Sequence, residues 1–189
     1  MKQRKEMNEF CAQAREALLR GGIAVIPTDT LYGIVARADD VEAVKCVYRV
    51  RGRDPRKPVI VLIAGRNDLG RFGVTLSPVQ KTYLANAWPG KVSVILPCTD
   101  SQFAHIHRGG RTIAFRVPAS DALRALLKKT GPLIAPSANP EGLHPAQTIA
   151  EARCYFGDAV DAYCDGGILS GSASTVVSFV SDAPKIMRA

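Results

Sequence analysis

The sequence predicts a single α/β domain over residues 1–189, with a twisted mixed sheet flanked by helices. Short apolar segments alternate with amphipathic ones through most of the chain, as in layered α/β folds. The last predicted strands follow one another without helices between them, which favours a mixed sheet over a purely parallel one. A chain of this length buries about 70% of its unfolded surface, which is enough for one core.

Hydrophobic spacing and turn residues predict each element in turn. In an amphipathic helix over 8–20, the residues Phe10, Ala14, Ala17 and Leu18 share one face, and two glycines end the helix. Apolar residues at helical spacing predict further helices over 41–50, 78–87, 121–129 and 149–156. Apolar runs bounded by turn residues predict strands at 23–26, 59–64, 92–96, 112–117, 133–135, 160–164, 175–180 and 185–188.

The charge balance points to an anionic partner. The chain has 25 Lys and Arg against 17 Asp and Glu, a formal charge of +8, and 47% of its residues are hydrophobic. This composition excludes a disordered chain and leaves nucleic acid, a nucleotide or a membrane surface as the anion. The first twenty residues lack the apolar run of a secretory signal, and no window approaches the ~18 apolar residues of a membrane span. We therefore expect a cytoplasmic protein without a membrane partner.

Cysteine and histidine spacing favours no metal site. The five cysteines are an odd number without a CxxC pair, and we expect buried structural thiols rather than disulfides or zinc ligands at Cys11, Cys46, Cys98, Cys154 and Cys164. His105 and His107 lie in a polar stretch bounded by glycines, where we expect solvent exposure. His144 is distant in the sequence, and no cluster of carboxylates or thiols accompanies the three histidines, so we expect no metal site.

Two polar segments adjoin predicted strands. The segment PTDTLYG (27–33) follows a buried strand, where hydroxyl groups can face a ligand, although in a simple turn Thr28 and Asp29 would cap the chain locally. The segment 49–58 places five cations within nine residues, among a glycine and two prolines. Arginine forks and a lysine ammonium suit phosphate oxygens, so this segment is a candidate triphosphate site.

Two further segments are rich in small polar residues. In 135–142, Ser137 and Asn139 alternate, so both side chains could point the same way and offer hydroxyl and amide groups to ribose or phosphate. Ordinary turn chemistry is the alternative. The segment 165–175 contains several glycines but neither GxGxxG nor GxxxxGK[ST], and a flexible connection accounts for it without a ligand.

In order along the chain, six motifs resemble those of the YrdC-like threonylcarbamoyl-AMP synthases, from about residue 22 to 188. The motifs are PTDTLYG, RGRDPRKPVIVLI, WPGKVSVIL, TIAFRVP, APSANPEG and STVVSF. The resemblance implies a YrdC/RibB-like fold and an ATP-dependent nucleotidyltransferase. Such enzymes make threonylcarbamoyl-AMP and pyrophosphate from L-threonine, bicarbonate or CO2, and ATP. A downstream complex then transfers the threonylcarbamoyl group to position 37 of tRNA.

The resemblance also implies a role for each residue at a matching position. The implied L-threonine site consists of Thr30, Leu62, Arg116, Ala135 and Ser174, with Arg116 on the substrate carboxylate. The implied ATP site consists of Arg53, Lys57, Thr112, Ser137, Asn139 and Arg188, with the catalytic pair Arg53 and Lys57 on the phosphates. Mg²⁺ is expected to arrive with ATP, held chiefly by phosphates and water.

The sequence departs from the family pattern at two positions. Arg51 stands where lysine is usual, and Glu141 stands where the family usually has serine. The sequence ends at Ala189, as expected of the short form of the family. Two other functions remain open: a module that binds tRNA or double-stranded RNA through its positive charge, and a paralogue of the same fold without the synthase activity.

Overall fold

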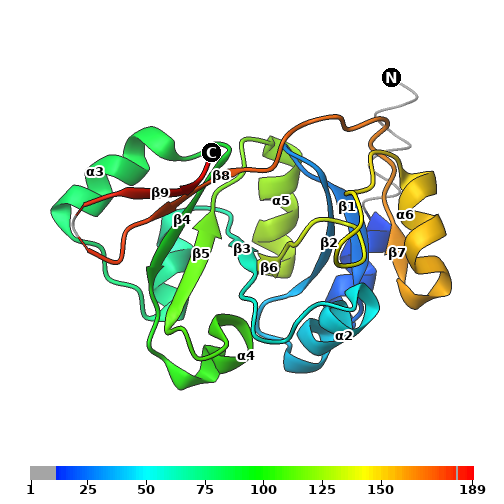
Figure 1. Ribbon diagram of the computed structural model, residues 1–189, viewed down its shortest axis with the longest axis horizontal. Helices are drawn as coiled ribbons and strands as arrows, with labels where there is room; N and C mark the ends of the chain where they lie inside the picture. Colours follow the sequence, from blue (N-terminus) through cyan, green and yellow to red (C-terminus); the bar gives the residue numbers. More distant parts are fainter. Residues whose placement is uncertain (1–11, 182) are drawn as a thin grey trace.

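Strand polarity in the sheet is mixed. The computed structural model describes residues 12–181 and 183–189, and Figure 1 shows their arrangement. Three neighbouring pairs are parallel (β1 with β7, β3 with β5, β4 with β8), and the other pairs of neighbouring strands are antiparallel. The mixed α/β class predicted from the sequence is confirmed. In sheet order the strands are β7 (Ala162–Tyr163), β1 (Ala24–Pro27), β2 (Tyr32–Arg37), β6 (Leu133–Ile134), β3 (Ile60–Leu62), β5 (Thr112–Arg116), β4 (Val92–Pro97), β8 (Thr175–Ser178) and β9 (Lys185–Arg188).

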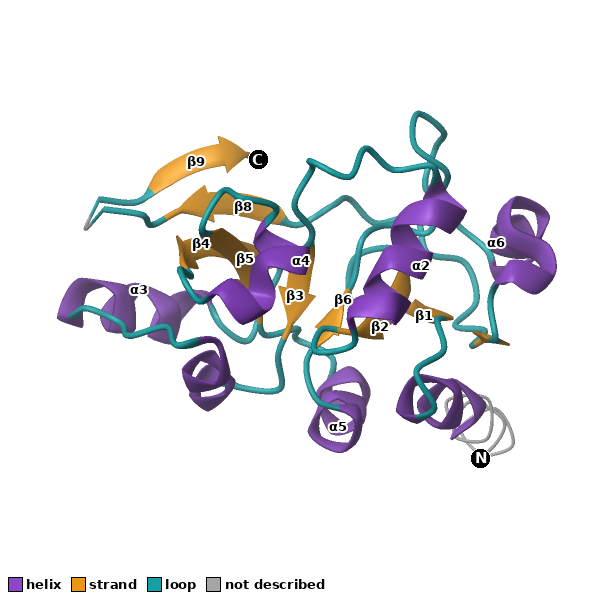
Figure 2. Ribbon diagram, turned by 90° about the horizontal axis from the view of Figure 1, so that it is seen from below, coloured by secondary structure: helices purple, strands orange, loops and turns teal. Residues whose placement is uncertain are grey.

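Helices cover both faces of the sheet (Figure 2). Beside the helical residues 12–19, the described α-helices are α2 (Val41–Arg51), α3 (Pro78–Ala87), α4 (Ala104–His107), α5 (Asp121–Thr130) and α6 (Ile149–Phe156). Three short 3₁₀ helices, η1 (Arg66–Phe72), η2 (Ser101–Phe103) and η3 (Gly157–Ala159), complete the connections. Within the described part of the chain, none of the helices combines the length and apolar character needed to cross a bilayer.

The alternation of side chains along β1 and β2 divides the core into two clusters. Val25 and Ile34 pack with α2, α4 and α6, whereas Ala24, Ile26 and Val35 pack with residues 12–19 and α5. Successive side chains of a strand point to opposite faces, so both faces of these strands are buried.

Local signals account for where the helices begin and end. The Ser77 hydroxyl accepts from the Gln80 N–H at the start of α3, and the Asp40 carboxylate accepts from the Ala43 N–H at the start of α2. Gly52 ends α2 with a φ of +57°, which costs glycine little. The predicted bounds of α3 and α6 are confirmed.

The structure corrects three sequence expectations. β2 is a strand paired with β1 that the sequence analysis did not predict, because an apolar run buried on both faces lacks the alternation of a half-exposed strand. The AHIH segment is the helix α4: His107 is buried, and the Nε2 of His105 lies 2.8 Å from the Ala38 carbonyl. Cys154 is exposed and Cys46 is half-buried, because each lies on a helix that is only partly covered, although Cys46 still packs against the core.

The other predictions for the cysteines and for the first helix are confirmed wherever the structure describes the residues. Cys98 and Cys164 are buried, as expected, whereas Cys11 and Phe10 lie outside the described residues. The helical face of residues 12–19 is buried as predicted.

Candidate active site

A cavity of about 440 Å³ opens over the sheet beside the β1–β2 turn. Its floor includes alternate residues of β5, Thr112, Ala114 and Arg116, whereas the intervening Ile113 and Phe115 enter the core on the other face. The TIAFR sequence thus turns one side of the strand to the core and the other to the cavity. The predicted site residues that line the cavity are Thr30, Arg53, Thr112, Arg116, Ala135, Ser137, Ser174 and Arg188.

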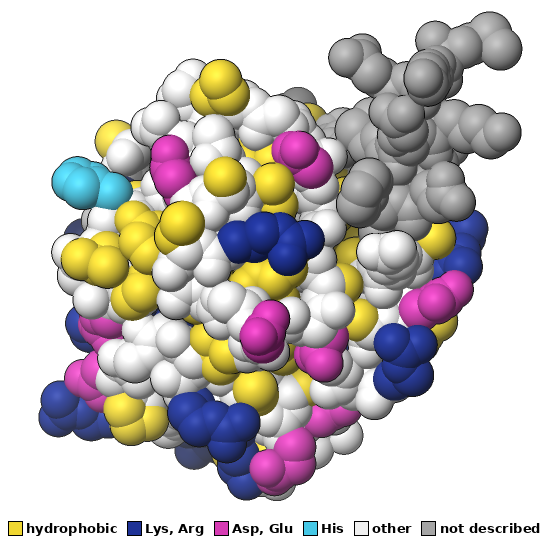
Figure 3. All heavy atoms as spheres, turned by 90° about the vertical axis from the view of Figure 1, so that its right-hand side faces the viewer, with side chains coloured by type: hydrophobic (Ala, Val, Ile, Leu, Met, Phe, Trp, Pro, Cys, Tyr) yellow, Lys and Arg dark blue, Asp and Glu magenta, His cyan; other side chains and the backbone are white. Residues whose placement is uncertain are grey.

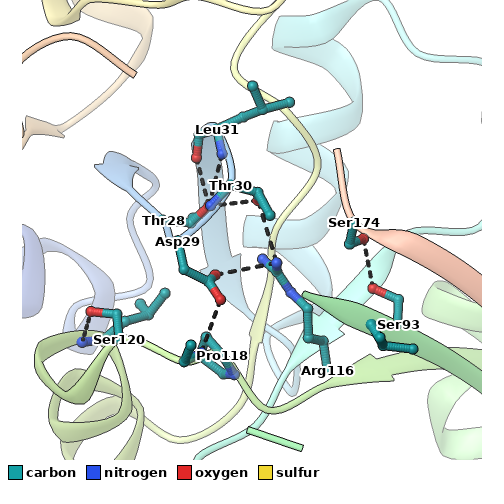
Figure 4. Close-up of polar contacts among 12 residues, drawn as sticks. Thr28, Asp29, Thr30, Leu31, Ser93, Arg116, Pro118, Ser120 and Ser174 are labelled. Carbon is teal, nitrogen blue, oxygen red and sulfur yellow. Dashed lines mark hydrogen bonds and ion pairs between the residues drawn. The ribbon is translucent and has the colours of Figure 1, made fainter. Parts of the chain in front are cut away.

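The β1–β2 turn holds the Thr30 hydroxyl in a fixed orientation (Figure 4). The Thr28 Oγ1 donates to the Leu31 carbonyl at 2.6 Å and lies 3.0 Å from the Thr30 Oγ1. Because the Thr28 hydrogen is already donated, Thr30 donates to Thr28. Its oxygen then accepts from the Nη1 of Arg116 at 3.3 Å.

Arg116 forms a buried ion pair with Asp29 (Figure 4). The Nη1 of Arg116 lies 3.2 Å from the Oδ1 of Asp29, and both side chains are less than a tenth exposed. The other carboxylate oxygen accepts from the Ala119 N–H at 2.9 Å. Burial lowers the pKa of Arg116, and the charge of Asp29 partly opposes that shift. The Nε of Arg116 is buried and has no hydrogen-bond partner among the described residues.

A second pair of cations lies at the end of α2. Arg51 is buried, and its Nε donates to the Asn139 carbonyl at 2.8 Å while its Nη1 has no partner among the described residues. Burial, followed by the neighbouring charge of Arg53, lowers the pKa of Arg51 to about 10, which leaves it cationic at neutral pH. The Nη2 of Arg53 donates to the Pro58 carbonyl at 2.8 Å. Both arginines line the cavity.

Three predicted residues do not line this cavity. Leu62 is fully buried in the core. The Lys57 ammonium is half-exposed and forms an ion pair with Glu141. Asn139 is buried, and its Nδ2 donates to the Pro140 and Leu143 carbonyls, each at 2.8 Å. The structure therefore brings together most of the predicted residues, but not these.

The expected shared direction of Ser137 and Asn139 is wrong. The Asn139 N–H donates to the Ser137 carbonyl at 3.0 Å, so the segment turns instead of remaining extended. Ser137 faces the cavity, while Asn139 supports the loop and contacts Arg51 with its Oδ1, 3.4 Å from the Nη2.

Two buried hydroxyls connect the far wall of the cavity to the sheet. The Oγ atoms of Ser93 and Ser174 are 2.9 Å apart (Figure 4). Arg188 donates from its Nη2 to the Ser174 carbonyl at 2.8 Å. Ser93 was not predicted as a site residue, since a serine within an apolar strand resembles an ordinary core position.

The glycine-rich segment 165–175 packs against the β1–β2 turn, although a flexible connection was the simpler expectation. The Tyr32 hydroxyl donates to the Gly167 carbonyl and accepts from the Gly166 N–H, each at 2.8 Å. Burial raises the pKa of Tyr32 to about 12, so the phenol keeps this proton at neutral pH. A Cβ on Gly171 would lie 2.4 Å from the Thr30 carbonyl oxygen, so the close approach requires glycine.

The cavity therefore combines two cationic regions with several hydroxyl-bearing side chains.

Among residues 12–181 and 183–189, no cluster of three or more His, Cys, Asp and Glu side chains could hold a metal ion. Asp29 is the partner of Arg116, and sequence reasoning treated it only as a local cap. Buried arginines beside hydroxyls suit a carboxylate or a phosphate as ligand.

The model of the Sua5/YciO/YrdC family, described as telomere recombination, matches residues 16–189. The chain belongs to this family. Among its Sua5/YciO/YrdC relatives, a threonylcarbamoyl-AMP synthase of Bacillus subtilis is 35% identical over 94% of this chain and 52% of its own length. A threonylcarbamoyl-AMP synthase of Marinobacter nauticus is 34% identical over 83% of this chain and 84% of its own length.

A solved Sua5/YciO/YrdC structure has the same fold. The crystal structure of P. abyssi Sua5 complexed with L-threonine superposes with a TM-score of 0.85 at 30% identity. The match covers 93% of this chain and 52% of that one. The chain thus spans about half the length of the Bacillus and P. abyssi relatives.

Proposed function

We propose that this protein is a threonylcarbamoyl-AMP synthase that uses L-threonine, bicarbonate or CO2, and ATP. The observation that carries the proposal is one cavity with two separate cationic regions, Arg116 beside Thr30 and Arg51 beside Arg53. An amino-acid carboxylate suits the first and a triphosphate the second. The volume of about 440 Å³ falls among those of small-molecule sites, roughly 300–1,000 Å³.

The proposed reaction needs no protein nucleophile. The amine nitrogen of threonine bonds to the carbon of CO2 and loses a proton, which gives an N-carboxylate. One of its oxygens attacks the α-phosphorus of ATP, and the bond from that phosphorus to the bridging oxygen breaks as pyrophosphate leaves. The reaction is a nucleotidyl transfer, and Arg53 would stabilise the charge that moves onto pyrophosphate.

The chain's own residues would orient the two substrates. Arg116 would bind the threonine carboxylate through its unpartnered Nε, while Thr30 holds the guanidinium from the other side. We propose that Mg²⁺ enters with ATP, because Asp29, beside the cavity, is already bonded to Arg116 and to the Ala119 N–H. Phosphates and water would then supply the ligands of Mg²⁺.

The decisive experiment supplies the pure protein with labelled bicarbonate, ATP, and either L-threonine or L-serine. We expect label to enter an adenylate only with threonine, accompanied by one pyrophosphate for each adenylate. ATP binding without this product would instead identify an inactive paralogue. The product would supply the downstream complex that modifies tRNA.

A second proposed activity is direct binding of tRNA or double-stranded RNA. Arg56 supports it, because its side chain is 88% exposed in the basic segment 49–58. The face around α6 and β7 is different: basic, acidic and apolar side chains are interspersed on it (Figure 3). This face therefore does not form a uniformly positive surface of the kind that suits RNA. RNA affinity that falls steeply as salt rises would support this activity, and undetectable binding at low salt would exclude it.

A further inference from the structure

Glu141 is bonded to the basic segment through three contacts. Its Oε1 forms an ion pair with the Nζ of Lys57. Its Oε2 accepts from the Asp54 N–H at 2.6 Å, and its own N–H donates to the Arg51 carbonyl at 2.8 Å. The carboxylate thus connects two donors of a turn, of which Lys57 is 84 residues away from it in the sequence.

The donors that Glu141 occupies are of the kind that suits phosphate. A lysine ammonium and a backbone N–H are common ligands of phosphate oxygens, and Asp54 directly follows Arg53, which lines the cavity. The pKa of Glu141 is lowered, chiefly by its bond to Lys57 and then by the Asp54 N–H. Glu141 therefore remains an anion at neutral pH, bonded to donors that would also suit a phosphate.

This contact can be displaced. The Lys57 and Glu141 side chains are 54% and 28% exposed, and ion pairs this accessible to water are weak. Gly142, which follows Glu141, has a φ of +89° and can take up a change in backbone direction.

We infer that Glu141 is a tethered competitor for the phosphate-binding donors of Lys57 and Asp54, and that it sets the affinity of the site for polyphosphate. The terminal phosphates of ATP displace its carboxylate on binding, and the carboxylate returns as pyrophosphate leaves. Glu141 is thus an affinity-determining residue of the nucleotide site. The inference rests on the proposed function only for the identity of the polyphosphate.

The test is the affinity of the full chain for inorganic pyrophosphate and for ATP, measured by titration calorimetry. Glu141→Gln keeps the size and the backbone contact but removes the charge. We expect it to lower Kd about threefold to fivefold for both ligands, as expected for the release of one exposed ion pair. Glu141→Ser should give a gain of similar size, and far-UV circular dichroism would show that both variants fold.

The matched control is Glu42→Gln, which removes the same charge from an exposed pair with Lys45 on α2. We expect the control to leave both Kd values within about twofold, because its charge lies in water outside the turn. Unchanged or weaker binding by Glu141→Gln would overturn the inference, as would an equal gain in the control. Failure of adenylate synthesis by the unaltered protein would contradict the proposed function but leave the pyrophosphate result standing.

Discussion

The cavity's two cationic regions differ in how they are held. Arg116 is buried, with Asp29 on one side and Thr30 on another, and these contacts join the β1–β2 turn to β5. The second region combines the buried Arg51, at the end of α2, with a surface turn whose Arg56 and Lys57 form ion pairs with nearby carboxylates. The first region is therefore buried, whereas the second is largely exposed beyond Arg51.

The difference matches the two proposed ligands. A threonine carboxylate is small, and a buried guanidinium already held in place loses little freedom when it binds. A triphosphate brings several charges of its own, so it can displace weak surface pairs. Mutations should therefore cost stability at Arg116 and nucleotide affinity or turnover at Arg53.

The largest effect is expected from Arg116→Met. It leaves the buried Asp29 carboxylate without its cation, and removing one partner of such a pair costs about 3–5 kcal/mol of unfolding free energy. Urea denaturation measures this loss. The double variant with Asp29→Asn should recover part of it, because no uncompensated charge remains. Wild-type stability in the single variant would contradict the contrast between the two regions.

Arg53→Ala should act on catalysis alone. Losing a charge-assisted hydrogen bond of roughly 1.5–3 kcal/mol should slow adenylate formation about tenfold to a hundredfold, measured by pyrophosphate release. The unfolding midpoint and the far-UV circular dichroism should stay unchanged, because Arg53 belongs to the surface turn. Near-normal turnover would remove Arg53 from its proposed role.

Ser93→Ala, at a position buried like Arg116, should lower the free energy of unfolding by less. It removes the buried partner of the Ser174 hydroxyl, so we expect a loss of about 1 kcal/mol in unfolding free energy. The KM for threonine should rise while the KM for ATP stays constant, because Ser174 belongs to the proposed threonine site. Ser101→Ala, at an exposed position, is the control and should change neither quantity. Equal shifts in both KM values would contradict this assignment.

Arg56→Ala should have the smallest effect. Arg56 lowers the pKa of Asp54 to about 2 through its side-chain and backbone hydrogen bonds, so the substitution should raise that pKa toward 3.8. Because the folded-state pKa is the lower one, any stabilisation from the pair is present above pH 3.8 and is lost as the pH falls toward 2. A carboxyl titration by NMR measures the shift. We expect no change in ATP affinity, and a clear loss would place Arg56 at the nucleotide.

Much of the secondary structure could be predicted from local signals. The bounds of α3 follow from Ser77 and Pro78, and those of α6 from Thr148 and Gly157, because caps and helix-breaking residues act within one turn. β2 escaped prediction because both of its faces are buried, and an apolar run of that kind has no distinguishing period.

The amino-acid sequence alone was enough to predict the mixed α/β class, the family resemblance and, through that resemblance, eight of the residues that line the cavity. These depend on residue type, order and local spacing. The pairing of Asp29 with Arg116, and of Glu141 with donors of the basic segment, became visible only in the folded chain. Folding also turned Asn139 away from the cavity and toward Arg51, which lies 88 residues away in sequence. The physical reason is that the orientation of a loop side chain depends on partners that folding brings near it. These partners are distant in the sequence, so they cannot be predicted from local spacing.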